Sequence, residues 1–225
     1  MLQAALNGGR SRGEHARVPL SAEELARDAR ACVDAGAGAV HLHPRDEHGR
    51  ETLDAHLVDA VVARVGEACG VPVGVSTGAW IAGDVAAAVR GWREPAYASV
   101  NLSEPAALEV ARALAERGIG IEAGVWSVAD ARRAASLAAR PLRVLVEVLA
   151  EDSAAAIHAA LDAAGVDAPR LQHGADANAW SVLDDAVARR LDTRIGLEDT
   201  LVLPDGSPAA GNVQLVEAAV ALGAR

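Results

Sequence analysis

The chain has 225 residues, of which 51% are hydrophobic, and a formal net charge of −10. This length is enough for one large core, and the acidic balance argues against a nucleic-acid partner, because phosphate backbones are bound by basic surfaces. All 21 basic residues are arginine, which excludes a Schiff-base lysine and the lysine of a Walker loop. Carbonyl chemistry would therefore need another electrophilic helper, such as a metal ion.

Short β-branched runs alternate with longer helical segments along the whole chain. The predicted strands are residues 2–6, 39–43, 71–75, 97–101, 120–123, 143–148, 170–173 and 193–197. A predicted helix follows each strand, at residues 21–35, 54–69, 83–91, 105–117, 127–139, 152–164, 178–190 and 211–223. Ser21 and Glu24 form a capping-box pattern, and Pro105 is placed for a first helical turn. Glycines stand where four helices should end, at Gly36, Gly70, Gly118 and Gly165.

Eight strand–helix units predict one (β/α)8 barrel domain, a TIM barrel, over residues 1–225. Such barrels typically have about 250 residues, so the loops must be short. An open doubly wound sheet is the alternative, because it also reads as alternating strands and helices. Polar residues at the ends of many strands favour the barrel, whose sites are assembled there.

Two features bear on the compartment of the protein. No apolar run approaches the roughly 18 residues of a membrane span, and residues 1–6 are too short for the core of a signal peptide. Cys32 and Cys69 fall inside predicted helices and share no C-x-x-C spacing. We expect two buried, reduced thiols in a cytoplasmic protein.

The first chemical signal is the His-x-His run that ends the second predicted strand. Alternate side chains on a strand share a face, so His41 and His43 point the same way. Two imidazoles at this spacing can bind one Zn²⁺ if a third ligand comes from elsewhere. Paired histidines also occur in ordinary cores and on surfaces, so the motif alone leaves both interpretations open.

The second signal lies at the end of the last predicted strand. Arg194, Gly196 and Glu198 would share its inward face, and Asp199 would open the next loop. Strands eight and two flank strand one in a closed barrel, so Glu198 can reach the two histidines. A His2Glu set leaves coordination positions open, as catalytic zinc sites do. The alternative is a buried arginine–carboxylate pair with a structural role only.

The third signal, residues 74–78, matches G-x-S-x-G. A nucleophile elbow would make Ser76 the attacking group with His173 as a possible partner, but it needs a helix that starts at the serine. Residues 78–83 read as a loop instead. We therefore expect Ser76 and Thr77 to donate hydrogen bonds to a substrate carboxylate or carbonyl.

Other strand ends also carry polar groups. Each alone is more often a loop or cap residue, but together they ring one face of the barrel and are candidate substrate contacts. They are Asn7 and Gly8, Asn101 with Glu104, Glu122, Glu147 and His173.

The motifs resemble the β-keto acid cleavage enzymes, a family whose founding activity is 3-keto-5-aminohexanoate cleavage. The resemblance rests on residues 7–9, 41–46, 76–78, 194–199 and 212–216. These runs occur in the order typical of the family and extend over nearly the whole chain.

The resemblance implies a Zn²⁺-dependent (β/α)8 barrel, usually a homo-oligomer, that condenses a β-keto acid with acetyl-CoA. The products would be acetoacetate and a new acyl-CoA. Carried over by position, the zinc ligands are His41, His43 and Glu198, the general base is Asp199, oriented by Arg194, and the carboxylate contacts are Ser76 and Thr77. In this scheme zinc polarises the β-keto carbonyl, the base takes a proton from acetyl-CoA, and the carbanion adds before a retro-Claisen step.

Four features depart from the family pattern. Arg10 stands where an acidic residue is typical, and Gly124 replaces a glutamate expected two residues after Glu122. Residues 102–104 read Leu-Ser-Glu instead of a small Gly/Thr pattern, and the exit of the sixth strand lacks a glycine-rich insertion. The acidic positions help to recognise an amino-bearing substrate, so we do not expect the founding substrate. The first loop carries three arginines that could bind CoA phosphates in place of the missing insertion, namely Arg10, Arg12 and Arg17; an ordinary solvated loop is the alternative.

Two other functions are compatible with these residues. One keeps the metal but acts as a lyase or hydrolase on a small carbonyl acid without CoA. The other is a catalytically inactive barrel that binds a small acid as a sensor or scaffold.

Overall fold

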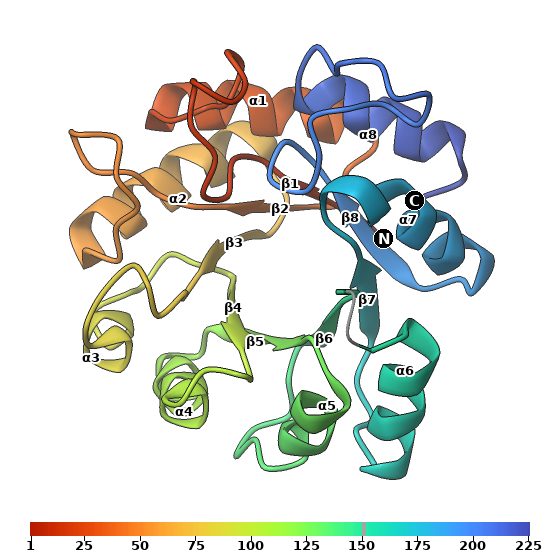
Figure 1. Cartoon of the computed structure of the whole chain (residues 1–225). Coiled ribbons are helices and arrows are strands. Elements are labelled where there is room, and N and C mark those ends of the chain that lie inside the picture. The colour runs from red at the N-terminus through yellow and green to blue at the C-terminus, as the bar shows by residue number, and fades with distance from the viewer. Residues whose placement is uncertain (150–151) are drawn as a thin grey trace.

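The computed structural model describes residues 1–149 and 152–225, which form a barrel of parallel strands inside a ring of helices (Figure 1). The strands are β1 (Leu2–Ala5), β2 (Ala39–Leu42), β3 (Val73–Ser76), β4 (Tyr97–Asn101), β5 (Gly120–Val125), β6 (Arg143–Glu147), β7 (Arg170–His173) and β8 (Asp192–Ile195). The helices are α1 (Ala22–Asp34), α2 (Ala55–Cys69), α3 (Val85–Val89), α4 (Ala107–Arg117), α5 (Val128–Ala134), α6 (Ala154–Ala163), the 3-10 helix η1 (Asp176–Asn178), α7 (Ala179–Ala188) and α8 (Asn212–Ala221).

The barrel closes where β1 pairs with both β2 and β8. Gln3 of β1 is opposite Ala39 on one side and Arg194 on the other. Asn212, at the start of α8, bridges this seam: its Nδ2 donates to Leu6 O at 2.8 Å, and its Oδ1 accepts from Leu197 N at 2.6 Å. The predicted closed barrel is therefore confirmed, and the open doubly wound sheet is wrong.

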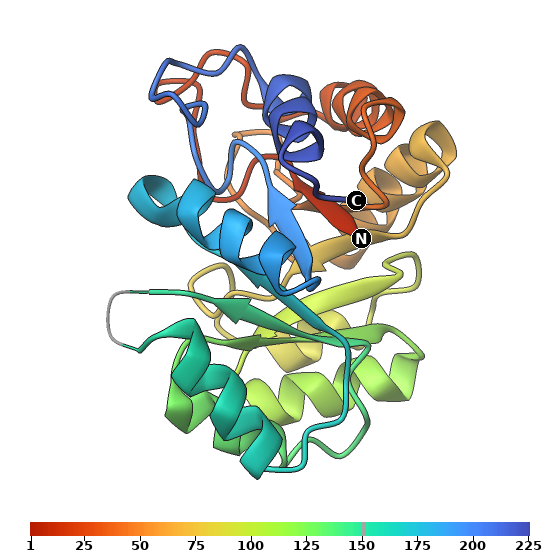
Figure 2. The same cartoon turned by 90° about the vertical axis from the view of Figure 1, so that its right-hand side faces the viewer.

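The loops that follow β1 and β8 lie side by side at one end of the barrel (Figure 2). His15 of the first loop contacts Ala209 O of the other loop at 2.9 Å. In such barrels the active site lies at the C-terminal ends of the strands, so we place the candidate site at this end. The exit of β6, where an insertion was expected to be missing, passes through residues 150–151, which lie outside the described residues.

Local capping signals place most helix ends as predicted. Glu24 N donates to Ser21 Oγ at 3.3 Å and Ser21 N donates to Glu24 Oε2 at 3.0 Å, which completes the capping box. Gly70 and Gly118 end α2 and α4 in the left-handed region, with φ of 69° and 73°. The expectation for Pro105 is wrong, because α4 begins at Ala107 after a turn.

Most other boundaries differ from the prediction by one or two residues, and three of the differences are instructive. β3 begins at Val73 because Pro72 has no N–H to donate. β8 ends at Ile195 rather than at residue 197, because the chain turns at Gly196, whose carbonyl accepts from Asp199 N at 2.9 Å and from Thr200 N at 3.0 Å. The helix predicted over residues 127–139 ends at Ala134, and nothing in the structure explains the difference.

Aliphatic side chains fill the space between strands and helices, as expected for a chain without phenylalanine. Cys32 in α1 and Cys69 in α2 are buried and free, as predicted. Across residues 1–149 and 152–225, we find no helix with the length and apolar character that a membrane crossing requires.

Replacing Gly196 with alanine should destabilise the fold, because a Cβ at this position would overlap the carbonyl of Ala5 in the adjacent strand. We expect a loss of about 2–3 kcal/mol in the free energy of unfolding, measured by urea titration. Gly66→Ala is the matched control: Gly66 lies inside α2 with no neighbour within 4 Å of its Cβ position. That variant should be as stable as the parent chain or up to about 1 kcal/mol more stable. Equal stability of both variants would contradict the proposed clash.

Candidate active site

The two histidines of β2 and the glutamate that follows β8 come together at the barrel mouth. His41 Nε2 lies 3.7 Å from Glu198 Oε2, and His43 Nε2 lies 3.7 Å from Glu198 Oε1. One ligand atom from each residue lies within 4.8 Å of the others. Two ligands that are each about 2.1 Å from a tetrahedral ion are about 3.4 Å apart. This geometry therefore fits a small divalent cation.

Glu198 reaches the histidines from the turn at Gly196, not from the strand itself as predicted. Its side chain passes directly over Gly8, which has a φ of +49°. A Cβ on Gly8 would overlap Glu198 Cγ, and the backbone there is in a region that favours glycine. Gly8 thus leaves the space through which Glu198 approaches the two imidazoles.

Asn7 holds the backbone of His43 in place. Its Oδ1 accepts from His43 N at 2.8 Å, and its Nδ2 donates to His43 O at 2.9 Å and to Pro19 O at 3.1 Å. The amide group of Asn7 is therefore fully engaged with the backbone. Its contact with a substrate stays a prediction, whereas its effect on His43 is direct.

The electrostatics of the cluster suit a cation. Burial lowers the pKa of His41 to about 3, so its imidazole is neutral and offers a lone pair. Burial acts to raise the pKa of Glu198, but Arg194 and the two histidines hold it below its ordinary value. His41 Nδ1 and Glu198 Oε2 are buried without a hydrogen-bond partner among the described residues. Such orphaned atoms are unusual and point to a missing partner.

Arg194 joins the cluster to Asp199, the residue after Glu198. Its Nη2 donates to Asp199 Oδ1 at 2.6 Å and to Glu198 Oε1 at 2.8 Å, and its Nε donates to Asp199 Oδ1 at 3.1 Å. Asp199 Oδ2 has no hydrogen-bond partner in the part of the chain that the structure describes. One oxygen of Asp199 is thus anchored, and the other is free to accept a proton.

His173, at the end of β7, also faces this group. Its Nδ1 lies 3.4 Å from Asp199 Oδ1, and both ring nitrogens are buried without a hydrogen-bond partner within residues 1–149 and 152–225. The structure therefore places His173 beside the candidate base, whereas the sequence predicted it at a strand end or as a partner of Ser76.

Ser76 is the last residue of β3 and Thr77 follows it; both side chains are buried. Ser76 Oγ accepts from Gly78 N at 3.2 Å, and its own proton is free to donate. Thr77 Oγ1 donates to Ser99 O at 2.7 Å. Because α3 begins only at Val85, no helix starts at Ser76, and the nucleophile elbow is excluded.

Two other candidate substrate contacts are tied to protein groups. Asn101 Nδ2 donates to Glu104 Oε1 at 3.2 Å. Glu122 Oε1 accepts from Arg143 Nε at 2.7 Å and from Gln3 Nε2 at 3.0 Å inside the barrel, while its Oε2 has no partner among the described residues. Contact of these side chains with a substrate stays a prediction.

Glu51 is a site residue that the sequence did not reveal. Its Oε1 lies 2.5 Å from His43 Nδ1, on the side of the ring away from Glu198. A tight turn closed by Asp46, which accepts from His48 N and Arg50 N, brings the chain back to the end of β2. The Asp46-x-x-Gly49 spacing is the signal that could have located it.

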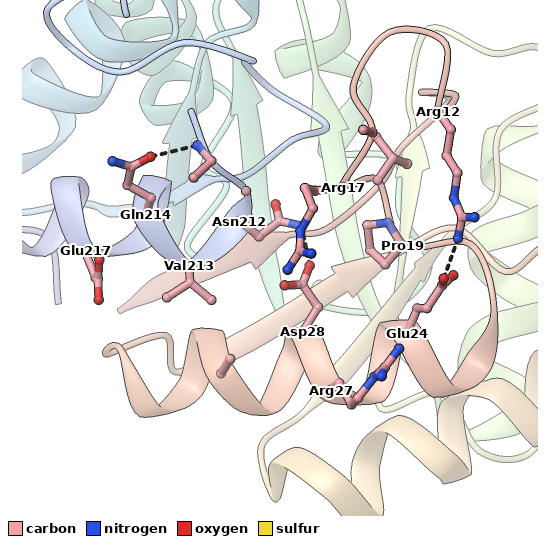
Figure 3. Close-up of a pocket in the computed structure, with 15 residues that line it drawn as sticks. Arg12, Arg17, Pro19, Glu24, Arg27, Asp28, Asn212, Val213, Gln214 and Glu217 are labelled. Atoms are coloured by element: carbon pink, nitrogen blue, oxygen red, sulfur yellow. Dashed lines mark hydrogen bonds and ion pairs between the residues drawn. The ribbon is translucent and has the colours of Figure 1, made fainter. Parts of the chain in front are cut away.

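A large cleft lies elsewhere, between the first loop, α1 and α8 (Figure 3). Its volume is about 680 Å³, and its lining includes neither the three candidate metal ligands, His41, His43 and Glu198, nor Asp199. Arginines and carboxylates balance in its lining, so it has no net charge that would favour an anion. These residues are Arg12, Arg17, Arg27, Glu24, Asp28 and Glu217.

Two of the arginines considered for CoA phosphates are already paired. Arg10 binds Glu14 and Asp176, and Arg12 binds Glu24. The Arg10–Asp176 contact joins the first loop to η1 after β7. The Arg12–Glu24 contact joins the same loop to α1, so both guanidinium groups fix the first loop in this structure.

Comparisons with known proteins agree with the fold and the sequence motifs. Two proteins named 3-keto-5-aminohexanoate cleavage enzyme match a stretch of 70 residues, 31% of this chain and 26% of each relative. The one from Acetoanaerobium sticklandii is 36% identical and the one from Fusobacterium nucleatum subsp. nucleatum is 34% identical. The matches thus span about a quarter of the length of these curated relatives.

A solved structure with the same fold is that of ObcA, described as a ternary complex with a C4-CoA adduct and oxalate. It superimposes with a TM-score of 0.68 at 18% identity, over 89% of this chain and 62% of that chain. A sequence model of the β-keto acid cleavage enzymes matches residues 1–225. The chain therefore belongs to the β-keto acid cleavage enzyme family.

Proposed function

We propose that this protein is a Zn²⁺-dependent enzyme that condenses a β-keto acid with acetyl-CoA and releases acetoacetate and a new acyl-CoA. The observation that carries the proposal is the cluster of His41, His43 and Glu198 beside the free oxygen of Asp199, in a chain of this family. The CoA adduct described for ObcA supports a CoA thioester as the partner of such a barrel.

His41, His43 and Glu198 would hold the metal ion. The donor set of two imidazoles and one carboxylate is typical of catalytic zinc, and the orphaned Glu198 Oε2 fits a cation. When bound, the ion supplies a Lewis acid that polarises the β-keto carbonyl.

The remaining chemistry falls to the residues of the chain. Asp199 Oδ2 would take a proton from the α-carbon of the β-keto acid, while Arg194 binds Oδ1 and orients the carboxylate. The resulting carbanion attacks the thioester carbon of acetyl-CoA, which forms the new carbon–carbon bond and releases CoA as a thiolate. The thiolate then adds to the keto carbonyl, and a retro-Claisen step breaks the bond between that carbon and the α-carbon. The acyl fragment leaves as the new acyl-CoA, and the acetoacetate carbanion takes the proton back from Asp199. Deprotonation of acetyl-CoA, the route expected from the resemblance, would instead end in acetate and a β-ketoacyl-CoA.

The keto acid would be oriented by side chains around the mouth. Ser76 and Thr77 would bind its carboxylate, with Ser76 Oγ as the donor whose proton is free. Gly8, Asn7, Asn101 and Glu122 are proposed to shape the rest of the pocket. We also propose a cytoplasmic, homo-oligomeric enzyme, on the basis of the two free cysteines and the family resemblance.

The proposed reaction is tested with zinc-loaded protein, acetyl-CoA and a panel of β-keto acids, with products identified by mass. We expect acetoacetate together with the acyl-CoA that corresponds to one of the acids, and no product when acetyl-CoA is omitted. Product without acetyl-CoA would instead support a lyase or hydrolase. Calorimetric binding of acids with no turnover of any of them would support a binding barrel.

A further inference from the structure

Glu51 connects a histidine of the candidate metal site to the loop after β3. One of its oxygens, Oε1, contacts His43 Nδ1, and the other, Oε2, accepts from Trp80 Nε1 at 3.1 Å. Arg45 Nη1 also lies 3.9 Å from Oε2. Both oxygens of the Glu51 carboxylate are therefore engaged.

Trp80 packs its ring against the backbone of its own loop, between β3 and α3. Its ring lies so close over Gly78 that a Cβ on this glycine would overlap it. The N–H of Ala79 donates to Glu104 Oε1 at 3.1 Å, which anchors the tip of the loop. Trp80 is nevertheless 59% exposed. The contact with Gly78 and the hydrogen bond from the indole to Glu51 therefore hold this exposed ring in position.

The contact between Glu51 and His43 selects which ring nitrogen can bind a metal. A carboxylate beside Nδ1 favours the proton on that atom, so the lone pair of the neutral ring lies on Nε2. Nε2 is the nitrogen that lies 3.7 Å from Glu198 Oε1. The side chain of His43 is buried and that of Glu51 is mostly buried, so water competes little for this hydrogen bond.

We propose that Glu51 is a positioning residue that orients His43 toward the metal ion, and that Trp80 secures Glu51 in this role. The inference rests on the metal site of the proposed function and deepens it. It links the affinity for the ion to the β3–α3 loop, which begins at Thr77 directly after Ser76, so both proposed carboxylate contacts lie at its start.

The contacts of Glu51 are those of an outer carboxylate of a metal site. One oxygen faces the ring nitrogen of His43 that points away from Glu198, and the other accepts from the Trp80 indole. Outer carboxylates of this kind typically change metal affinity by about 10–100-fold when they are removed.

The test measures zinc affinity by competition with a chromophoric chelator for the parent chain and for Glu51→Gln, Trp80→Phe and Trp180→Phe. Glu51→Gln should weaken binding by about 10–100-fold, and Trp80→Phe should lose affinity in the lower part of that range. Trp180→Phe is the matched control, because its indole donates to Val202 O and does not contact Glu51. It should bind zinc like the parent chain.

Urea unfolding of the metal-free proteins separates positioning from folding. The metal-free Glu51→Gln chain should unfold at the same urea concentration as the parent, and only the stabilisation by zinc should shrink. Zinc affinity of Glu51→Gln within twofold of the parent would overturn the inference and leave the proposed function intact. A parent chain that binds no zinc would overturn the proposed metal site and this inference with it.

Discussion

Asp199→Asn is expected to lower turnover by about 10²–10⁴-fold, the usual contribution of a general base. The amide is close in size to the carboxylate and can still accept a hydrogen bond from Arg194 through its oxygen, but it cannot take a proton. The structure divides the two oxygens of Asp199 between these tasks, since Oδ1 binds Arg194 and Oδ2 is free. The measurement is the steady-state rate of acyl-CoA formation with saturating acetyl-CoA.

The control for this variant is its zinc content. Arg194 keeps its contact with Glu198 Oε1, so the metal site should stay assembled and hold the same amount of zinc as the parent chain. A near-normal rate in a zinc-loaded variant would remove Asp199 as the base. His173, whose Nδ1 lies 3.4 Å from Asp199 Oδ1, would then be the next residue to replace.

His41→Ala and Glu198→Ala are each expected to reduce the zinc content from about one ion per chain to nearly none, because three protein ligands are the minimum typical of catalytic zinc. Metal analysis after dialysis against a weak chelator measures this loss. Turnover should fall with it. His56→Ala removes an exposed histidine of α2 and should leave the zinc content unchanged. Full zinc in both site variants would show that the ion is bound elsewhere.

The sequence was sufficient to predict the barrel and to single out the three residues that the structure brings together as a candidate metal site, His41, His43 and Glu198. Strand periodicity and the glycines at helix ends are local signals that can be read from the sequence. Eight consecutive strand–helix units are compatible with few folds, of which the closed barrel is one. The closed barrel then places β2 next to β1 and β1 next to β8, which brings His41 near Glu198. Because His41 and His43 are two residues apart on one strand, the sequence also predicts that their side chains lie on the same face.

Other parts of the site depend on contacts that no local pattern encodes. Glu51 approaches His43 only because the turn after β2 folds back, and Trp80 meets Glu51 from another loop. Gly196 was predicted within the strand, because its neighbours alternate as strand residues do. In the barrel its closeness to Ala5 and its hydrogen bonds to the next turn end the strand there.

The candidate metal site can form only when β1 has paired with both β2 and β8, because its ligands come from either side of β1. An unfolded chain keeps the His-x-His pair together, but Glu198 lies far along the sequence and joins it only when both flanks of β1 are paired. A cation held by all three residues therefore binds the folded state more tightly than any denatured state. Such a ligand adds about 2.7 kcal/mol of stability at a free concentration 100 times its dissociation constant. Opening of the seam and release of the ion would then be thermodynamically linked, so a bound cation would stabilise the pairing of β1 with β8.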